Sequence, residues 1–214
     1  MHKLKKHNIY IIGNCTNLLE AKQLQKAGCD AIIAQGMEAG GHRGSFLNHS
    51  ENDEIGLFSL IQELKIFIKI PIIAAGGIAS GKSILAAKIL GATAVQIGTG
   101  FLLTYESGAS DEYKNEILNS HAHETLLTKK ISGQKARGKN NSLIKKMGAS
   151  YEKILPFPIQ NFMTKETRND AQKNKNSQYM SLWCGQSISC FHKVMHVKDF
   201  IDNLVSEYNE ALRT

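Results

Sequence analysis

Three glycine-rich loops contain the residues of this sequence that could do chemistry. The first loop, Ala34–Gly44, holds His42, whose imidazole can take up or release a proton near neutral pH. Its four glycines let the backbone approach a ligand closely. A histidine that follows a parallel strand is well placed to act as a general base. Taken alone, the loop could also be a flexible turn whose His42 and Arg43 face solvent; together with the next two loops, the functional interpretation is favoured.

The second and third loops favour binding of a phosphate group. Ala74–Gly81 combines the end of a predicted strand with a glycine pair and a helix N-terminus, where backbone amides and the helix dipole attract anions. Gln96–Gly100 offers the Thr99 hydroxyl and the amides of two glycines. Glycine loops after neighbouring strands form the phosphate site of β/α barrels. Each loop alone could be a structural turn, and the sequence has no P-loop or dinucleotide fingerprint.

The elements that must position these loops are predicted to be alternating strands and helices. Apolar runs at 8–13, 30–35, 71–75 and 92–97 predict buried strands. Predicted helices follow the first three: one capped by Thr16 or Asn17, one at 56–68 and one capped by Ser80. This alternation predicts a parallel sheet covered by helices, with the carboxyl ends of its strands at one edge, where ligands bind.

The rest of the chain shows no clear strand rhythm. Helical patterns occur near 109–119, 121–131 and 197–212, and polar stretches at 132–141 and 165–177 lie between them. We therefore expect two domains, 1–104 with the β/α units and 105–214 as a helical region. The second is expected to cover the mouth of the sheet on the substrate side and to close with a helix.

Composition narrows the possible partners. The net charge is +7, but its lysines are scattered and not interleaved with aromatic residues, so we expect no nucleic-acid partner. No apolar run is long enough to cross a membrane, and the default location is the cytoplasm. The four cysteines lack the spacing of a zinc site, and we expect no metal.

Several motifs of the sequence resemble those of nitronate monooxygenases, formerly called 2-nitropropane dioxygenases. The similar runs are AQGMEAGGHRG (34–44), IIAAGGIASG (72–81), VQIGTGF (95–101), SGQKARG (132–138), FPIQN (157–161) and MSLWCGQS (180–187). They extend over nearly the whole chain. Flavin-dependent enoyl-ACP reductases carry close versions of the glycine loops, but Gln35 and the downstream motifs favour the monooxygenases.

The resemblance implies an FMN-binding TIM barrel with a smaller helical domain. It also implies oxidation of alkyl nitronates, such as propionate 3-nitronate, by O2 to a carbonyl product and nitrite. Carried over by position, His42 would be the catalytic base or a substrate-orienting group, with Glu38 or Arg43 as candidates to orient it. Gln35 and Gly40 would line the flavin. The phosphate would be held by Gly77, Gln96, Ile97, Gly98 and Thr99.

The sequence departs from this family in one respect. Only four β-α units are visible, whereas a barrel needs eight, so we expect the second half of a barrel without the first. The chain could be a non-catalytic flavin-binding fragment, could pair with a separately encoded N-terminal half, or could form a homo-oligomer. An FMN-dependent enoyl-ACP reductase remains an alternative activity.

Overall fold

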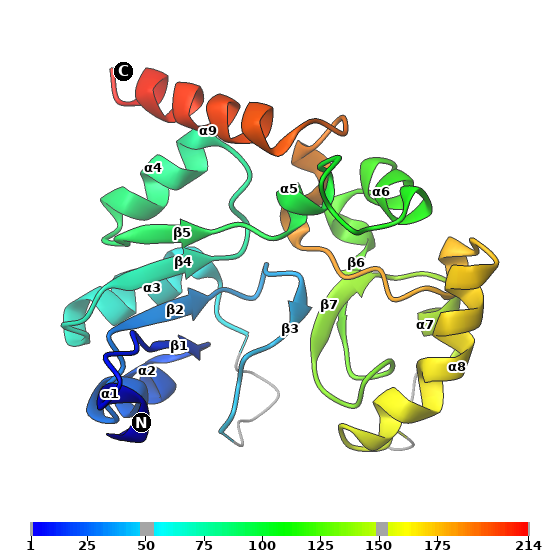
Figure 1. Ribbon diagram of the computed structural model, residues 1–214, viewed down its shortest axis with the longest axis horizontal. Coiled ribbons are helices and arrows are strands. Elements are labelled where there is room, and N and C mark those ends of the chain that lie inside the picture. Colours follow the sequence, from blue (N-terminus) through cyan, green and yellow to red (C-terminus); the bar gives the residue numbers. More distant parts are fainter. Residues whose placement is uncertain (1, 48–53, 149–153, 214) are drawn as a thin grey trace. The chain divides into compact units, whose positions relative to one another are not determined.

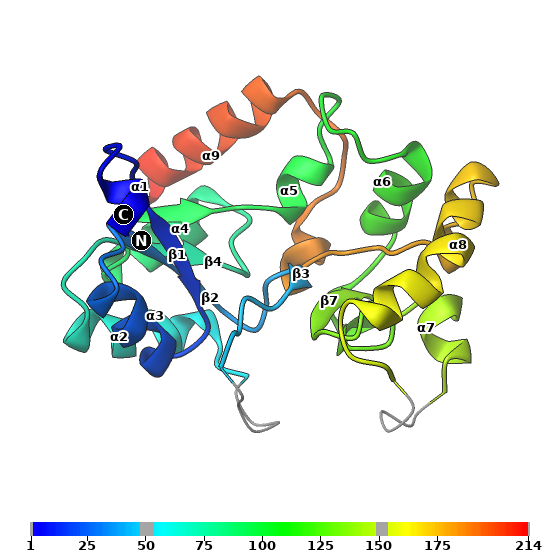
Figure 2. The same cartoon turned by 60° about the horizontal axis from the view of Figure 1, so that its bottom comes forward.

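The computed structural model describes residues 2–47, 54–148 and 154–213. The chain divides into two compact units (Figures 1 and 2). The first unit consists of Met1–Ala39, Gly44–Ile97 and Ile201–Thr214, and the second of Gly40–Arg43 and Gly98–Phe200. The boundary therefore follows Ile97, and the last residues return to the first unit. The proposed division at residue 104 remains a prediction.

A four-stranded parallel sheet forms the centre of the first unit. Its strands are β1 (Ile12–Cys15), β2 (Ala31–Gln35), β4 (Ile72–Ala75) and β5 (Ala94–Gln96), in the order β1-β2-β4-β5. Figure 1 shows the four strands side by side with their carboxyl ends at the same edge. The strands predicted at 30–35, 71–75 and 92–97 are thus confirmed, whereas β1 shares only Ile12 and Gly13 with the predicted 8–13, where Asn8 has a left-handed φ of 55°.

Helices follow the strands as predicted. They are α2 (Leu18–Lys26), α3 (Leu57–Phe67) and α4 (Gly81–Ile89), and a short helix that was not predicted, α1 (His2–Lys5), precedes β1. The Asn17 side chain caps α2, and Ser80 and Ser83 form a reciprocal capping box at α4. Gly28 and Gly91 end their helices with φ of 92° and 115°, a conformation that glycine adopts without strain.

The core of the first unit lies between the sheet and these helices. Leu60, Ile61 and Leu64 of α3 are at most 1% exposed and pack with Ile32 and Ile72 of the strands. The side chains that alternate with the core residues along β1 and β5 are exposed, such as Ile12 at 49%, or half-buried, such as Asn14. Burial of aliphatic side chains on the helix-covered face is therefore the main force that fixes this sheet.

The second unit contains a small antiparallel sheet. Its strands are β3 (Gly41–His42), β7 (Ala136–Lys139) and β6 (Thr125–Thr128), in the order β3-β7-β6. Around it lie α5 (Thr99–Leu102), α6 (Asp111–Leu118), η1 (Ala122–Glu124), α7 (Ser142–Lys146), α8 (Ile159–Lys173), η3 (Ser177–Tyr179) and η4 (Gln186–Cys190). The closing helix α9 (Val197–Ala211) begins in this unit and continues in the first.

The region after residue 104, where the sequence shows helical patterns and no clear strand rhythm, also contains strands. The stretch 121–131, predicted to be a helix, contains only the short η1 and strand β6, and the polar stretch 132–141 contains strand β7. These strands are only four residues long, so pairing with each other, rather than local pattern, fixes them. The helices predicted near 109–119 and 197–212 are confirmed as α6 and α9.

The polar stretch at 165–177 was also misjudged, because most of it belongs to helix α8. The buried side of α8 is polar: Gln160 Nε2 donates to the Lys130 carbonyl at 2.7 Å, and Thr164 Oγ1 donates to the Ile131 carbonyl at 2.7 Å. A helix that buries hydrogen-bonding side chains gives no apolar periodicity to detect. Within the described ranges, no helix is both long and apolar enough to span a membrane.

Candidate functional site

The carboxyl edge of the parallel sheet brings two predicted site residues into one row. Gln35 of β2 pairs in register with Ala75 of β4, and Ala75 pairs with Gln96 of β5. Neighbouring strands are about 4.8 Å apart, so the two glutamines stand roughly 10 Å from each other on the same face. Gln96 is exposed and Gln35 is half-buried. The adjoining Ile97 is half-buried and packs against the core of this unit.

Gln35 and Glu38 both hold the chain that follows them. Gln35 Oε1 accepts a hydrogen bond from the Gly44 amide at 2.7 Å. Both carboxylate oxygens of Glu38 accept from the Leu57 amide at 3.0 Å, which places a negative charge at the start of α3. Gly56, the residue before this helix, offers no side chain for the purpose. Glu38 is therefore a helix cap, and its expected role in orienting His42 is wrong.

The glycine pair after β4 makes a turn that other residues could not make. Gly76 has a φ of 112°, and a Cβ there would lie 2.9 Å from the Ala39 nitrogen. Gly77 has a φ of 69°. No acceptor for the amides of Gly77 or Ile78 is present among the described residues. These two N–H groups are thus available to an anionic group of a ligand.

The N-terminus of α4 already holds an anion. The Gly81 amide donates to Glu207 Oε2 of α9 at 2.8 Å, and the Ser83 amide donates to the Ser80 hydroxyl at 3.2 Å. A Cβ on Gly81 would lie 2.1 Å from the Tyr208 nitrogen, so this glycine serves the contact with α9. The sequence pattern correctly indicated a position that attracts negative charge, but the charge in the structure is that of Glu207.

In the second unit, three predicted residues meet one segment, Trp183–Gly185. A Cβ on Gly40 would lie 2.5 Å from the Cys184 carbonyl carbon and 2.6 Å from the Gly185 nitrogen. The Thr99 hydroxyl accepts from the Gly185 amide at 2.9 Å, and Thr99 is 8% exposed. The ring of His42 lies 5.5 Å from that of Trp183. Packing on this segment, rather than strand register, gathers these residues.

His42 is held by strand β3 and by a hydroxyl group. It pairs with Ala136 of β7, and its Nε2 lies 2.8 Å from Ser132 Oγ. The ring contacts Phe157 edge-on, at 6.3 Å between centroids. His42 nevertheless remains exposed to solvent. A fixed imidazole with access to solvent can exchange a proton with a small molecule.

The environment of His42 favours the neutral imidazole. Partial burial of the ring lowers the pKa of His42, and the positive charge of Arg168 lowers this pKa further. Arg168 is fixed by α8, where its Nη2 donates to Asn161 Oδ1 at 2.8 Å. Arg43, the other residue expected to orient His42, is buried at 4% exposure, and its carbonyl accepts from Gln134 Nε2.

Gly98 differs from the other predicted glycines because nothing in the described chain explains it. Its φ of −106° is available to any residue. A Cβ at this position would meet no described atom within 4 Å. A glycine with neither a backbone nor a packing requirement is expected where a ligand approaches the main chain. This position therefore fits the close approach of a phosphate group.

Sequence reasoning missed Ser132 and Arg168, two of the side chains that act on His42. Both lie in segments predicted as polar stretches, 90 and 126 positions after His42. Ser132 opens the SGQKARG run, which was noted only as part of the resemblance. Its burial, at 1% exposure, is the feature that distinguishes it, and only the structure shows that burial.

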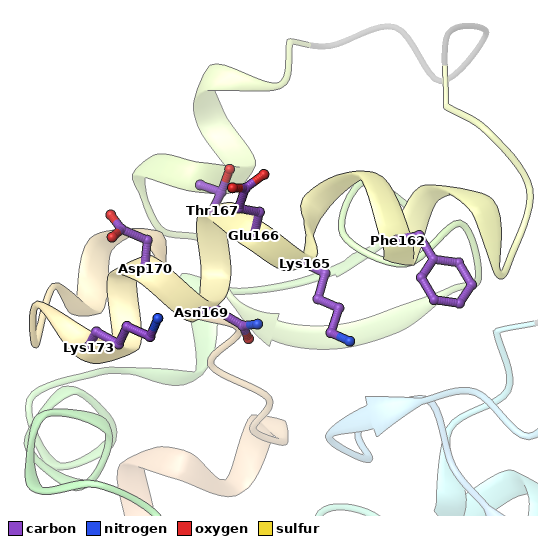
Figure 3. A pocket seen from close by; sticks show the side chains of 7 residues that line it. All are labelled: Phe162, Lys165, Glu166, Thr167, Asn169, Asp170 and Lys173. Carbon is purple, nitrogen blue, oxygen red and sulfur yellow. The ribbon is translucent and has the colours of Figure 1, made fainter.

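A separate hollow of about 640 Å³ lies along α8. Figure 3 shows that the side chains lining it all come from this helix, with Glu166 and Asp170 on one side and Lys165 and Asn169 on the other. None of the predicted site residues lines this hollow. In the part of the chain that the structure describes, no three histidine, cysteine or acidic side chains are grouped as a metal site would require.

Comparison with known sequences decides the family. The family model described as nitronate monooxygenase matches residues 1–207. The chain belongs to the nitronate monooxygenase family. A probable nitronate monooxygenase from Staphylococcus saprophyticus is 41% identical over 216 residues, and one from Staphylococcus haemolyticus is 40% identical over 214. Each alignment covers 99% of this chain and 60% of the relative, so the chain spans about three fifths of their length.

Solved structures support the same fold. The nitroalkane oxidase from Streptomyces ansochromogenes superposes with a TM-score of 0.91 at 34% identity, over 99% of this chain and 61% of that one. FabK from Thermotoga maritima gives a TM-score of 0.84 at 31% identity, over 100% and 65%. The α/β fold of the TIM-barrel type is thus confirmed for the part present. Family members are flavin-dependent oxidoreductases.

Proposed function

We propose that this chain forms part of a flavin-dependent enzyme that oxidises alkyl nitronates, such as propionate 3-nitronate, with O2 to a carbonyl product and nitrite. The observation that supports this most is the match of residues 1–207 to the family, together with a His42 held by Ser132 beside Trp183. The chain spans three fifths of its relatives, so turnover and substrate belong to this proposal.

We propose FMN as the cofactor. FMN would supply the redox chemistry of the reaction, and the protein would position the substrate and exclude competing reactions. The fit rests on two observations: the amides of Gly77 and Ile78 have no acceptor in the described chain, and Gly98 leaves open space beside its backbone. Carried over from the resemblance, the cofactor residues remain Gln35, Gly40, Gly77, Gln96, Ile97, Gly98 and Thr99.

His42 would remove a proton from the α-carbon of a neutral nitroalkane or orient the nitronate. The lowered pKa keeps the ring unprotonated at neutral pH, which is the form that a base requires. We therefore expect the turnover of neutral nitroalkanes to rise with pH through a pKa below the ordinary histidine value of 6.5.

The test compares His42→Asn with His196→Asn in the purified protein. His196 is a suitable control, because it lies at the surface and pairs with Glu106 at 3.1 Å. We expect yellow protein with flavin absorbance in both, and oxygen uptake with a neutral nitroalkane about 100-fold lower in His42→Asn only. Equal rates in the two variants would reject His42 as the base.

The same preparation tests the partners and the non-catalytic alternative. Flavin absorbance with no oxygen uptake from propionate 3-nitronate would favour a flavin-binding fragment. The apparent mass would show whether the chain forms a homo-oligomer. An assay with an added second polypeptide that carries further β-α units would show whether activity depends on them. A colourless protein would contradict FMN as the cofactor of this chain alone.

An FMN-dependent enoyl-ACP reductase is the second candidate. The likeness to FabK, nearly as great as that to the nitroalkane oxidase, favours keeping it. The two activities differ in their electron donor. NADH oxidation coupled to reduction of an enoyl thioester, without oxygen uptake from a nitronate, would support the reductase and reject the monooxygenase.

A further inference from the structure

The hydroxyl group of Ser132 has three polar neighbours and a single proton. Ser132 Oγ lies 3.1 Å from the backbone carbonyl oxygen of Gln134 and 3.3 Å from the backbone nitrogen of the same residue. It also lies 2.8 Å from His42 Nε2. A carbonyl oxygen can only accept, and an amide can only donate. If the hydroxyl proton goes to the carbonyl, the remaining two neighbours must both donate to Ser132 Oγ.

The turn that contains Ser132 holds this arrangement in place. Gly133 has a φ of 88°, and its amide donates to the Lys129 carbonyl at 2.7 Å. A Cβ on Gly133 would lie 2.5 Å from the Leu155 oxygen and the Phe157 nitrogen, so the turn is packed closely against the segment before α8. Ser132 is 1% exposed, and water therefore has little access to replace either partner.

When the ring of His42 is neutral, its tautomer decides which nitrogen is basic. Partial burial and the charge of Arg168 lower its pKa, as described above. A neutral imidazole carries one proton, on either Nδ1 or Nε2, and the hydrogen bond of one nitrogen decides which. With the hydroxyl proton directed to the Gln134 carbonyl, Ser132 Oγ can bond Nε2 only if Nε2 carries the proton.

We propose that Ser132 is a positioning residue that fixes neutral His42 with its proton on Nε2 and its basic lone pair on Nδ1. The juxtaposition of Ser132 Oγ, the Gln134 carbonyl and His42 Nε2 supports this assignment. For the reaction, the consequence rests on the proposed function: the basic lone pair of the His42 ring is then that of Nδ1.

The experiment is a two-dimensional ¹⁵N–¹H spectrum of protein labelled with ¹⁵N-histidine, recorded without cofactor or substrate at a pH where His42 is neutral. The His42 signals are assigned by their loss in His42→Asn. We expect Nε2 to show the chemical shift of a protonated ring nitrogen and Nδ1 that of an unprotonated one. In Ser132→Ala the two shifts should move toward values averaged over both tautomers, and Ser132→Thr should restore them.

Ser120→Ala is the matched control, because Ser120 is a serine of the same unit, 3% exposed, whose hydroxyl donates to the Glu116 carbonyl. It should leave the His42 signals unchanged. A proton on Nδ1 in the unaltered protein would overturn the proposal even if Ser132→Ala fails to fold. Unchanged His42 shifts in a folded Ser132→Ala protein would also overturn it.

Turnover provides a second readout. Ser132→Ala should lower kcat for a neutral nitroalkane about tenfold and leave the rate with a preformed nitronate within about twofold, since only the first needs a base. Absence of flavin or of oxygen uptake in the unaltered protein would contradict the proposed function alone. The spectrum is independent of that outcome, so the two failures can be distinguished.

Discussion

The two units place their predicted site residues by different means. In the first, Gln35 and Gln96 share a row because three parallel strands pair in register. In the second, Gly40, His42 and Thr99 are gathered because each touches the segment Trp183–Gly185. Strand register follows from local apolar patterns, whereas packing on a distant segment does not. The second unit should therefore be the more sensitive to small changes in side-chain volume.

Gly40→Ala should have the largest effect on stability. Its new methyl group would meet backbone atoms of Cys184 and Gly185 at 2.5–2.6 Å, and backbone cannot yield as a flexible side chain can. Overpacking of this kind costs about 3 kcal/mol. Chemical denaturation should show this loss. A variant as stable as the unaltered protein would mean that packing on this segment does not hold the second unit together.

Glu20→Gln should lower the stability of the first unit by a similar, slightly smaller amount. The carboxylate of Glu20 is 4% exposed and accepts from Thr16 and from the segment Ser45–Leu47. Hydrogen bonds to a buried charge are worth about 2 kcal/mol, and we expect a loss of that order. Glu63→Gln on α3 of the same unit is the control, because the Glu63 carboxylate has no hydrogen bond or ion pair among the described residues. It should change stability by less than about 0.5 kcal/mol.

The pH dependence of unfolding checks the same carboxylate. Burial raises the pKa of Glu20, but hydrogen bonds from Thr16, Phe46 and Ser45 outweigh burial and hold this pKa below 4.5. A lowered pKa means that the stabilisation is complete above about pH 4.5 and is lost as the pH falls through the native value. Denaturation midpoints of Glu20→Gln should therefore fall less steeply with acid than those of the unaltered protein. Parallel curves would contradict this role of Glu20.

Glu207→Gln should have a smaller effect. It removes the charge held at the start of α4 but keeps an oxygen that can accept from the Gly81 amide. Charges at helix N-termini contribute about 0.5 kcal/mol when exposed. Glu210→Gln, which changes a carboxylate nearly one helical turn further along α9, is the matched control. The difference between the two variants should shrink at high salt, and a difference that is insensitive to salt would exclude the helix dipole as its cause.

Gly98→Ala should have the least effect on stability and a clear one on cofactor binding. Its Cβ would meet no described atom within 4 Å, so we expect a change within about 0.5 kcal/mol. If a phosphate approaches this backbone, flavin affinity should fall about tenfold, equivalent to 1.4 kcal/mol. Gly108→Ala is the control, because Gly108 also faces open space but lies outside the predicted site. Equal flavin content in the two variants would remove Gly98 from the phosphate site.

Much of the first unit could be predicted because its signals are local. Apolar runs mark β2, β4 and β5, and Asn17, Ser80, Gly28 and Gly91 mark helix ends as expected. Fewer signals were available for the second unit. Strands β6 and β7 are short and depend on each other, and α8 buries polar side chains that resemble those of a loop.

The site residues show the same contrast between local sequence signals and long-range contacts. His42 could be identified from its loop, but the hydroxyl and guanidinium that act on it come from residues 132 and 168. Glu38 shows the reverse error. Its proximity in sequence to His42 suggested a partnership, whereas its carboxylate caps α3. Short separation along the chain is a poor guide to contact once a loop leaves its strand.

The sequence by itself determined the order of strands and helices in the first unit, the glycine turns, the histidine and the family to which they belong. These follow from hydrophobic periodicity, from the conformations that glycine allows and from motif similarity, all of which are local. Only the tertiary structure decided the electrostatic surroundings of His42, the antiparallel sheet and the role of Glu207. The surroundings of His42, the addition of β3 to this sheet and the role of Glu207 depend on contacts between residues about 90 or more positions apart, which no local sequence pattern specifies.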